Sequence, residues 1–126
     1  MSIDRKEIRP IIIGLDSKIP NSVEEKFQNE TLRPIIKMQH DLLLKYFSSY
    51  LLSKKCYFDN LTQLKREAFI EAAFKKDISF KSELKGLIFG QFTVFEFTIY
   101  CSNKRDFNKR ILTMIQQRIT SVIELF

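Results

Sequence analysis

Residues 92–101 read Phe-Thr-Val-Phe-Glu-Phe-Thr-Ile-Tyr-Cys, and their conformation decides the fold class of this chain. β-Branched and aromatic residues favour a strand, in which Glu96 and Thr98 would share one face. Thr93 and Glu96, however, have the spacing of a capping box, which begins a helix. A strand would also need a partner, and only residues 8–13 offer one. We therefore predict a short buried helix, with a strand as the alternative.

The aromatic side chains of this stretch favour a core position. A surface that stacks nucleic-acid bases needs exposed rings interleaved with cations. Residues 86–103 contain no Lys or Arg. We therefore assign to the core the four phenylalanines of the region, Phe89, Phe92, Phe95 and Phe97.

Helical signals recur through residues 22–126. Ser22 and Glu25 have capping-box spacing, and apolar residues then follow a 3.6-residue period. The predicted helices cover residues 22–30, 34–54, 62–75, 77–90 and 103–125. A single helix from Ser22 that is kinked near Pro34 is an equal alternative for the first two, and Asp77 or Ser79 begins the fourth.

Two glycines and one apolar stripe predict further details of the fourth and third helices. Gly90 should end the fourth helix as a left-handed cap, and Gly86 should mark close backbone packing. The buried face of helix 62–75 should consist of the stripe Leu64, Ala68, Phe69, Ala72 and Ala73.

Length and composition agree with a helical domain. The chain has 126 residues, 44% of them hydrophobic, with three glycines and three prolines. So few turn residues favour long helices over a β-sandwich. We predict an all-α bundle of about five helices over residues 22–126, preceded by an N-terminal extended arm over residues 1–21. The arm is indicated by the β-branched, Pro-containing segment 8–14.

The sequence offers no recognisable catalytic or metal site. His40 is the single histidine, so no second histidine can complete a metal site with it, and we expect it to be a structural or surface residue. No Gly-rich phosphate loop occurs. Cys56 follows two lysines, but an inert, partly buried thiol is the favoured interpretation. We predict a protein that is not an enzyme and needs no cofactor or metal.

The two cysteines and the absence of long apolar runs indicate where in the cell the protein is expected. No run approaches the ~18–20 apolar residues of a membrane span. Two dispersed cysteines do not form a disulfide framework. We expect a cytoplasmic protein that has no membrane partner.

Arg118 is the most informative residue of the last helix. On a helical wheel, the apolar face of residues 103–126 includes Arg118. A buried guanidinium needs a partner because an isolated buried charge is costly. An internal carboxylate such as Glu96 or Asp41 is the predicted partner, and the alternatives are an oligomer interface and an anionic ligand. The outer face is neutral and indicates a partner surface: Thr113, Gln116, Gln117, Thr120 and Ser121.

A basic cluster lies at the start of the last helix. It consists of Lys104, Arg105, Lys109 and Arg110. Cations at a helix start oppose the helix dipole, and Asp106 offsets only part of the charge. With a net charge of +6, this cluster is the best candidate for contact with an anionic partner.

Several segments resemble a short bacterial family of unknown function, over residues 3 to about 120. The segments are Thr31-Leu32-Arg33-Pro34-Ile35, Asp41-Leu42-Leu43-Leu44, Gly86 with Gly90-Gln91-Phe92-Thr93-Val94, and Lys109-Arg110-Ile111. Some members of the family are named glyoxalase, a name that implies a divalent metal held by His and Glu side chains on strand-rich modules. His40 alone does not match that ligand set, so the resemblance implies no activity, ligand or metal here.

Together these observations predict a non-enzymatic interaction or assembly module that associates with itself or with another protein. The alternative is a nucleic-acid-binding accessory protein that uses the basic cluster. Arg118, Lys104, Arg105, Lys109 and Arg110 are the candidate anion or partner contacts.

Overall fold

The computed structural model describes residues 22–126, and these residues contain no strand. The all-α prediction is therefore confirmed, while the predicted arm, residues 1–21, lies outside the described residues. The α-helical segments are α1 (Val23–Phe27), α2 (Arg33–Met38), α3 (His40–Ser53), α4 (Gln63–Lys76), α5 (Ile78–Phe89), α6 (Val94–Ser102) and α7 (Lys104–Ser121). A π-helical turn, Gln28–Leu32, joins α1 to α2, and 3-10 turns lie at Phe58–Asn60 and Ile123–Leu125.

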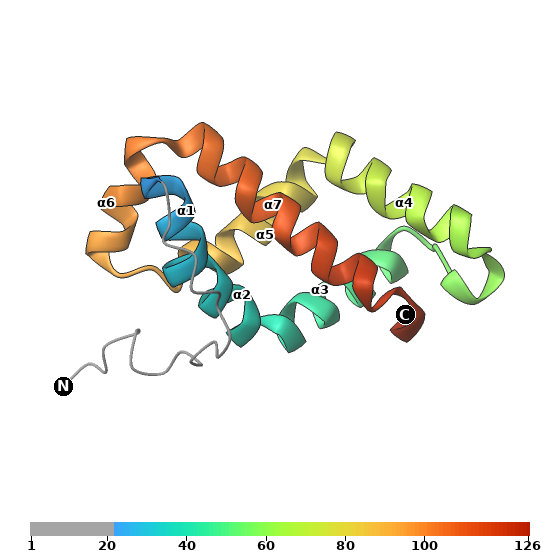
Figure 1. Cartoon of the computed structure of the whole chain (residues 1–126). Coiled ribbons are helices and arrows are strands. Elements are labelled where there is room, and N and C mark those ends of the chain that lie inside the picture. Colours follow the sequence, from blue (N-terminus) through green and yellow to red (C-terminus); the bar gives the residue numbers. More distant parts are fainter. Residues whose placement is uncertain (1–21) are drawn as a thin grey trace.

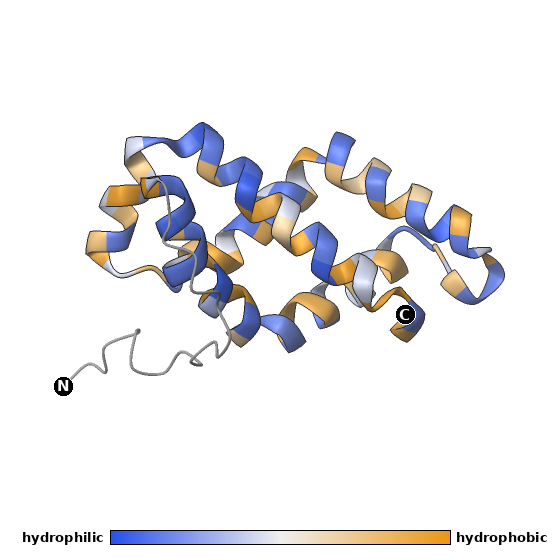
Figure 2. Ribbon diagram, in the orientation of Figure 1, coloured by the Kyte–Doolittle hydropathy of each residue, from blue (hydrophilic) through white to orange (hydrophobic). Residues whose placement is uncertain are grey.

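Helix α7 lies at the centre of the bundle and contacts α3, α4, α5 and α6. In Figure 1 it runs diagonally across the molecule in front of α5, with α6 and α4 at opposite ends. Its hydrophobic and hydrophilic residues alternate along the ribbon in Figure 2, as expected for a helix that buries one face. Every helix contributes to one core cluster, and α7 supplies to it four side chains that are wholly buried: Phe107, Ile111, Ile115 and Ile119.

The helix starts follow the sequence signals closely. Ser22 Oγ accepts a hydrogen bond from the Glu25 N–H at 3.1 Å. Asp77, not Ser79, begins α5, because its Oδ1 accepts from the Phe80 N–H at 3.1 Å. Thr93 and Glu96 form the complete capping box, so the stretch that decided the fold class is the helix α6.

Helix α1, the π turn and α2 form one continuous but irregular helix over residues 23–38, in agreement with the predicted alternative of a single helix that is kinked near Pro34. The wide π turn at Gln28–Leu32 ends two residues before Pro34, and the Arg33 N–H bonds to the Gln28 carbonyl five residues back. Proline has no backbone N–H to donate, and in a regular helix its ring would clash with the carbonyl four residues back. Gln39, at φ −89° and ψ 8°, then separates α2 from α3. Gln39 thus divides the predicted helix 34–54 into α2 and α3.

The expectations for the two glycines were wrong. Gly90 ends α5 in the right-handed helical region, at φ −61°, and a Cβ added at Gly86 would meet nothing within 4 Å. The left-handed cap is instead at Lys55, with φ 53°, after the end of α3. There the Cys56 N–H bonds to the Leu51 carbonyl and the Lys55 N–H to the Leu52 carbonyl, which is the Schellman pattern.

The predicted buried face of α4 was partly wrong. Ala73 is buried and Phe69 packs against the core as predicted, but the helix is rotated so that the rest of the stripe is exposed. Leu64, Ala68 and Ala72 are exposed. The buried residues of α4 are Ile70, Ala73 and Phe74. Leu42, an apolar residue in the first turn of α3, is exposed as well.

Two tyrosine–carboxylate hydrogen bonds join α3 to α5. Tyr46 donates to Glu83 Oε2 at 2.5 Å, and Tyr50 donates to Asp77 Oδ2 at 2.7 Å. Lys54 Nζ lies 3.8 Å from Asp77 Oδ2, and the Phe80 N–H bonds to the other carboxylate oxygen. The hydrogen bond from the Tyr50 hydroxyl, and after it the bond from the Phe80 N–H, hold the pKa of Asp77 below its usual range.

This pKa shift predicts a loss of stability in acid. A carboxyl group whose pKa is lower in the folded than in the unfolded state stabilises the fold above the unfolded-state pKa, and this contribution disappears as the pH falls through the folded-state pKa. We expect Asp77→Asn to flatten the decline of the urea midpoint below about pH 4. Asp59→Asn removes an exposed carboxylate elsewhere and should leave the decline unchanged. Equal flattening by both variants would contradict the assignment to Asp77.

Candidate interaction sites

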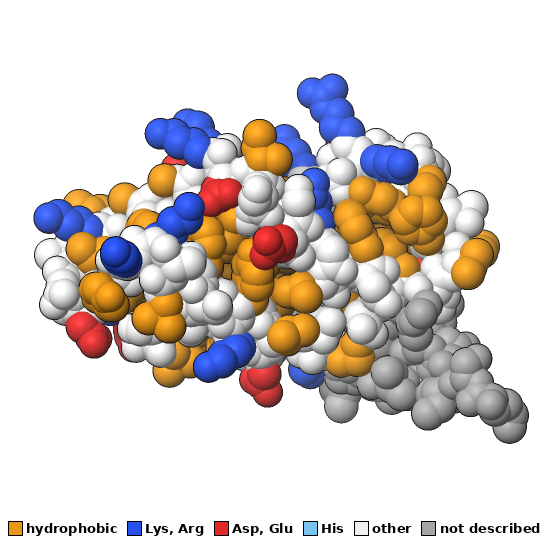
Figure 3. Space-filling model, turned by 180° about the vertical axis from the view of Figure 1, so that it is seen from behind, with side chains coloured by type: hydrophobic (Ala, Val, Ile, Leu, Met, Phe, Trp, Pro, Cys, Tyr) orange, Lys and Arg blue, Asp and Glu red, His pale blue; other side chains and the backbone are white. Residues whose placement is uncertain are grey.

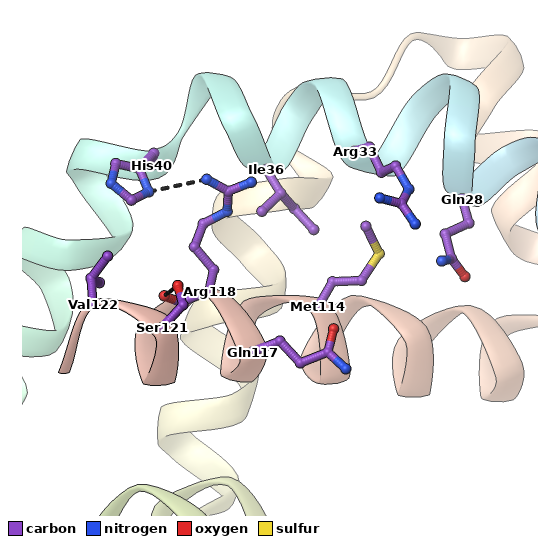
Figure 4. A pocket seen from close by; sticks show the side chains of 9 residues that line it. All are labelled: Gln28, Arg33, Ile36, His40, Met114, Gln117, Arg118, Ser121 and Val122. Carbon is purple, nitrogen blue, oxygen red and sulfur yellow. Dashed lines mark hydrogen bonds between the residues drawn. The ribbon is translucent and has the colours of Figure 1, made fainter. Parts of the chain in front are cut away.

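A cleft lies between the α2–α3 segment and α7 (Figure 4). Its volume is about 420 Å³. Three of its described lining residues carry basic side chains and none carries a carboxylate. We call it the arginine cleft; it is lined by Gln28, Arg33, Ile36, His40, Met114, Gln117, Arg118, Ser121 and Val122.

Arg118 crosses this cleft from α7 to α3. Its Nη1 lies 3.2 Å from His40 Nδ1. Because arginine can only donate, Nδ1 is the acceptor in this contact. The prediction of a carboxylate partner for Arg118 was therefore wrong: Asp41 is exposed, and Glu96 is bonded to Thr31 and Thr93.

The charge of Arg118 is not neutralised within the described part of the chain. The ion pair found there joins Lys54 to Asp77. Arg118 is partly buried, and desolvation lowers its pKa. His40 supplies a hydrogen bond but no negative charge.

Arg33 provides a second cation from the opposite wall. It lies in the first turn of α2, and its Nε donates to Asn29 Oδ1 at 3.0 Å. This bond leaves the two terminal nitrogens of the guanidinium available. In Figure 4 the Arg33 and Arg118 side chains both extend between the two walls.

The structure divides the predicted basic cluster. Lys104, Arg105 and Lys109 are exposed, whereas Arg110 is partly buried. Arg110 Nη1 donates to Gln28 Oε1 at 2.7 Å, so it points towards the π turn. A second cleft along α7 shares Gln28, Met114 and Gln117 with the arginine cleft, and it contains the carboxylate of Asp106. Its described lining residues are Gln28, Asp106, Lys109, Arg110, Thr113, Met114 and Gln117.

Helix α6 presents an exposed apolar surface, which corrects the assignment of all four phenylalanines to the core. Phe92 is buried and Phe89 partly buried, but Phe95 is 68% and Phe97 46% exposed. Val94 is 84% exposed, and Cys101 lies on the same outward side of the helix. Figure 3 shows hydrophobic side chains gathered at the end of the molecule that α6 forms. We call the surface of Val94, Phe95, Phe97, Thr98 and Cys101 the α6 face.

Sequence reasoning identified Arg118 but missed the rest of the cleft. His40 was treated as structural and Arg33 was not singled out as a site residue. The spacing of Arg33 and His40, seven residues, places both on one side of a helix and was the available signal. The spacing could not show that this side of the helix packs against α7.

The described residues give little support for a metal site, a reactive cysteine or a membrane-spanning helix. No group of three or more His, Cys, Asp or Glu side chains there could hold a metal ion. Burial raises the pKa of the Cys56 thiol, which is opposite to what a reactive cysteine needs. Among the helices of residues 22–126, none combines the length and the apolar character of a membrane span.

Comparison with protein-family models, curated proteins and solved structures finds no match for this chain. The family resemblance of the sequence therefore stays a prediction.

Proposed function

We propose that this chain is a non-enzymatic assembly module that associates with a second copy of itself through the α6 face. The observation that carries the proposal is the exposure of Val94, Phe95 and Phe97 on one short helix. In Figure 2, α6 is mainly hydrophobic along its length. The free thiols of Cys56 and Cys101 support a reducing compartment, and we include a cytoplasmic location in the proposal.

The charge distribution favours a second copy over a charged partner. The chain is 29% charged, yet Glu96 is the one charged residue in residues 86–103, and it is buried. The α6 face therefore cannot select a partner by charge. A twofold contact brings the same surface of both copies together, and an uncharged apolar face can meet its own copy without repulsion.

The surroundings of the face predict how association depends on salt. Lys104 and Arg105 directly follow α6 and are exposed. Two copies that meet through α6 bring these cations closer together, and salt screens their repulsion. Association should therefore strengthen as the salt concentration rises, whereas binding to nucleic acid weakens.

Sedimentation equilibrium tests the proposal. We expect the mass to rise from 15.0 kDa towards twice that value between about 10 and 500 µM, the range of weak association. Phe95→Glu should keep the protein monomeric. It should also preserve the helix, because an acidic residue suits the first turn of α6. Leu64→Glu introduces the same charge on α4, where Leu64 is 77% exposed, and should leave association unchanged.

Two results would overturn self-association. One is a monomer at every concentration and salt level. The other is equal disruption by Phe95→Glu and Leu64→Glu. A monomer that binds duplex DNA with a log–log salt slope near ~−3.6, lost when Lys104, Arg105, Lys109 and Arg110 become Gln, would establish the nucleic-acid alternative instead. The exposure of Lys104, Arg105 and Lys109 is the observation that favours this alternative.

A further inference from the structure

We propose that the arginine cleft binds the phosphoryl group of a small phosphorylated molecule, with Arg118 and Arg33 as its ligands and His40 holding Arg118 in position. The inference does not involve α6 and goes beyond self-association. It rests on the convergence of basic side chains from two walls upon one cleft without a carboxylate among the described residues that line it.

The donors approach from different directions. Arg118 reaches across from α7, while Arg33 belongs to the α2–α3 wall (Figure 4). A planar carboxylate pairs best with one guanidinium in a common plane. A tetrahedral phosphoryl group has three terminal oxygens that point apart, so it can accept from donors on both walls.

The donors also have unused capacity. A guanidinium carries five N–H groups. One N–H of Arg118 is occupied by His40, and Nε of Arg33 by Asn29. The remaining N–H groups can bond to phosphoryl oxygens while both existing contacts persist.

The electrostatics of the cleft favour an anion. Two arginines are held there, and partial burial weakens the hydration of Arg118 and lowers its pKa. An anion beside Arg118 would offset this desolvation. Because water screens the partly buried site less than a fully exposed one, the attraction should exceed that of an exposed arginine.

The size and lining indicate a ligand larger than inorganic phosphate. The volume of about 420 Å³ lies in the range of small-molecule sites. Gln28, Gln117 and Ser121 offer polar groups for hydroxyls. Ile36, Met114 and Val122 provide an apolar surface for a carbon skeleton. A sugar phosphate or a mononucleotide combines these features.

Isothermal titration calorimetry on the full chain tests the assignment, with ribose 5-phosphate and AMP as esters and inorganic phosphate and acetate as comparisons. We expect at least one ester to bind with a Kd of about 1 mM or tighter, more tightly than phosphate, and acetate to give no heat. Arg118→Gln and Arg33→Gln should each weaken ester binding about 10-fold or more, the usual effect of losing a charge-assisted hydrogen bond.

Arg105→Gln is the matched control, because it makes the same charge change at an exposed position of α7. It should leave ester binding unchanged. Arg33 is exposed, so its variant keeps the test decisive even if Arg118→Gln unfolds the protein.

Three results would overturn the proposal: no binding of any ester at about 10 mM, equal weakening by Arg105→Gln and Arg33→Gln, or an ester that binds no more tightly than inorganic phosphate. The readout is independent of oligomeric state, so a monomeric protein that binds an ester would refute self-association and support this site.

Discussion

Replacing Phe47 with alanine is expected to lower the free energy of unfolding by about 3–5 kcal/mol, the usual cost of deleting a buried phenylalanine ring. Phe47 is wholly buried in α3. Its ring centroid lies 4.9 Å from that of Phe126, 6.0 Å from that of Phe58 and 6.1 Å from that of Phe80. The ring therefore connects α3 with α5, with the turn before α4 and with the carboxyl-terminal residue.

Urea denaturation followed by circular dichroism measures this effect. Phe47→Leu retains part of the buried volume and should cost less. Leu64→Ala removes an exposed side chain from α4 and should change the free energy by no more than about 0.5 kcal/mol. A Phe47→Ala variant as stable as Leu64→Ala would mean that the aromatic cluster does not stabilise the fold.

The second large effect is expected at Glu96, which is 2% exposed although it carries a carboxylate. Its Oε1 accepts from the Thr93 N–H at 2.8 Å, and its Oε2 from the Thr31 hydroxyl at 3.3 Å. Glu96→Ala removes a cap, worth about 1 kcal/mol, and leaves the buried Thr31 hydroxyl without this acceptor, at about 1–3 kcal/mol. The expected loss is about 2–4 kcal/mol.

A double-mutant cycle isolates the Thr31 contribution. Thr31→Val keeps the shape and removes the donor, so the double variant should be less destabilised than the sum of the single variants. Glu96→Gln should cost less than Glu96→Ala, because the amide oxygen can still accept from the Thr93 N–H. Strict additivity of Thr31→Val and Glu96→Ala would show that the two side chains are not coupled.

The sequence predicts the helix starts well because capping depends on residues three positions apart. Ser22, Asp77 and Thr93 each accept from the backbone N–H three residues later. In residues 92–101 this local hydrogen bonding overcame the strand preference of the β-branched and aromatic side chains. A propensity is weak when the backbone has a specific alternative.

The sequence fails where the answer depends on neighbouring helices. The apolar residues of α4 surround much of the helix, so periodicity did not reveal that Ile70 and Phe74 face the core while Leu64 and Ala68 are exposed. The same holds for Phe95 and Phe97, since α6 is apolar on both its buried and its exposed sides.

The arginine cleft contains one feature that the sequence predicted and one contact that it did not. The wheel placed Arg118 within the apolar face of α7, and the side chain is partly buried in the structure, because that question concerns one helix. Its contact with His40 joins residues 78 positions apart and follows from tertiary packing alone. Glu96, the expected partner, is instead occupied with capping its own helix.

The π turn between α1 and α2 also determines which insertions and deletions the arginine cleft can tolerate. Each residue of a π turn rotates the chain by less than the ~100° of a regular α-helix, so Gln28–Leu32 absorbs about one extra residue. Removing one residue there would restore the regular winding and keep Phe27, buried against Phe92 and Phe107, in the core. Removing two residues, or inserting one that the turn does not absorb, would rotate α1 by about 100° relative to α2 and take Phe27 out of the core. Single deletions should therefore be tolerated in this turn better than longer deletions or insertions.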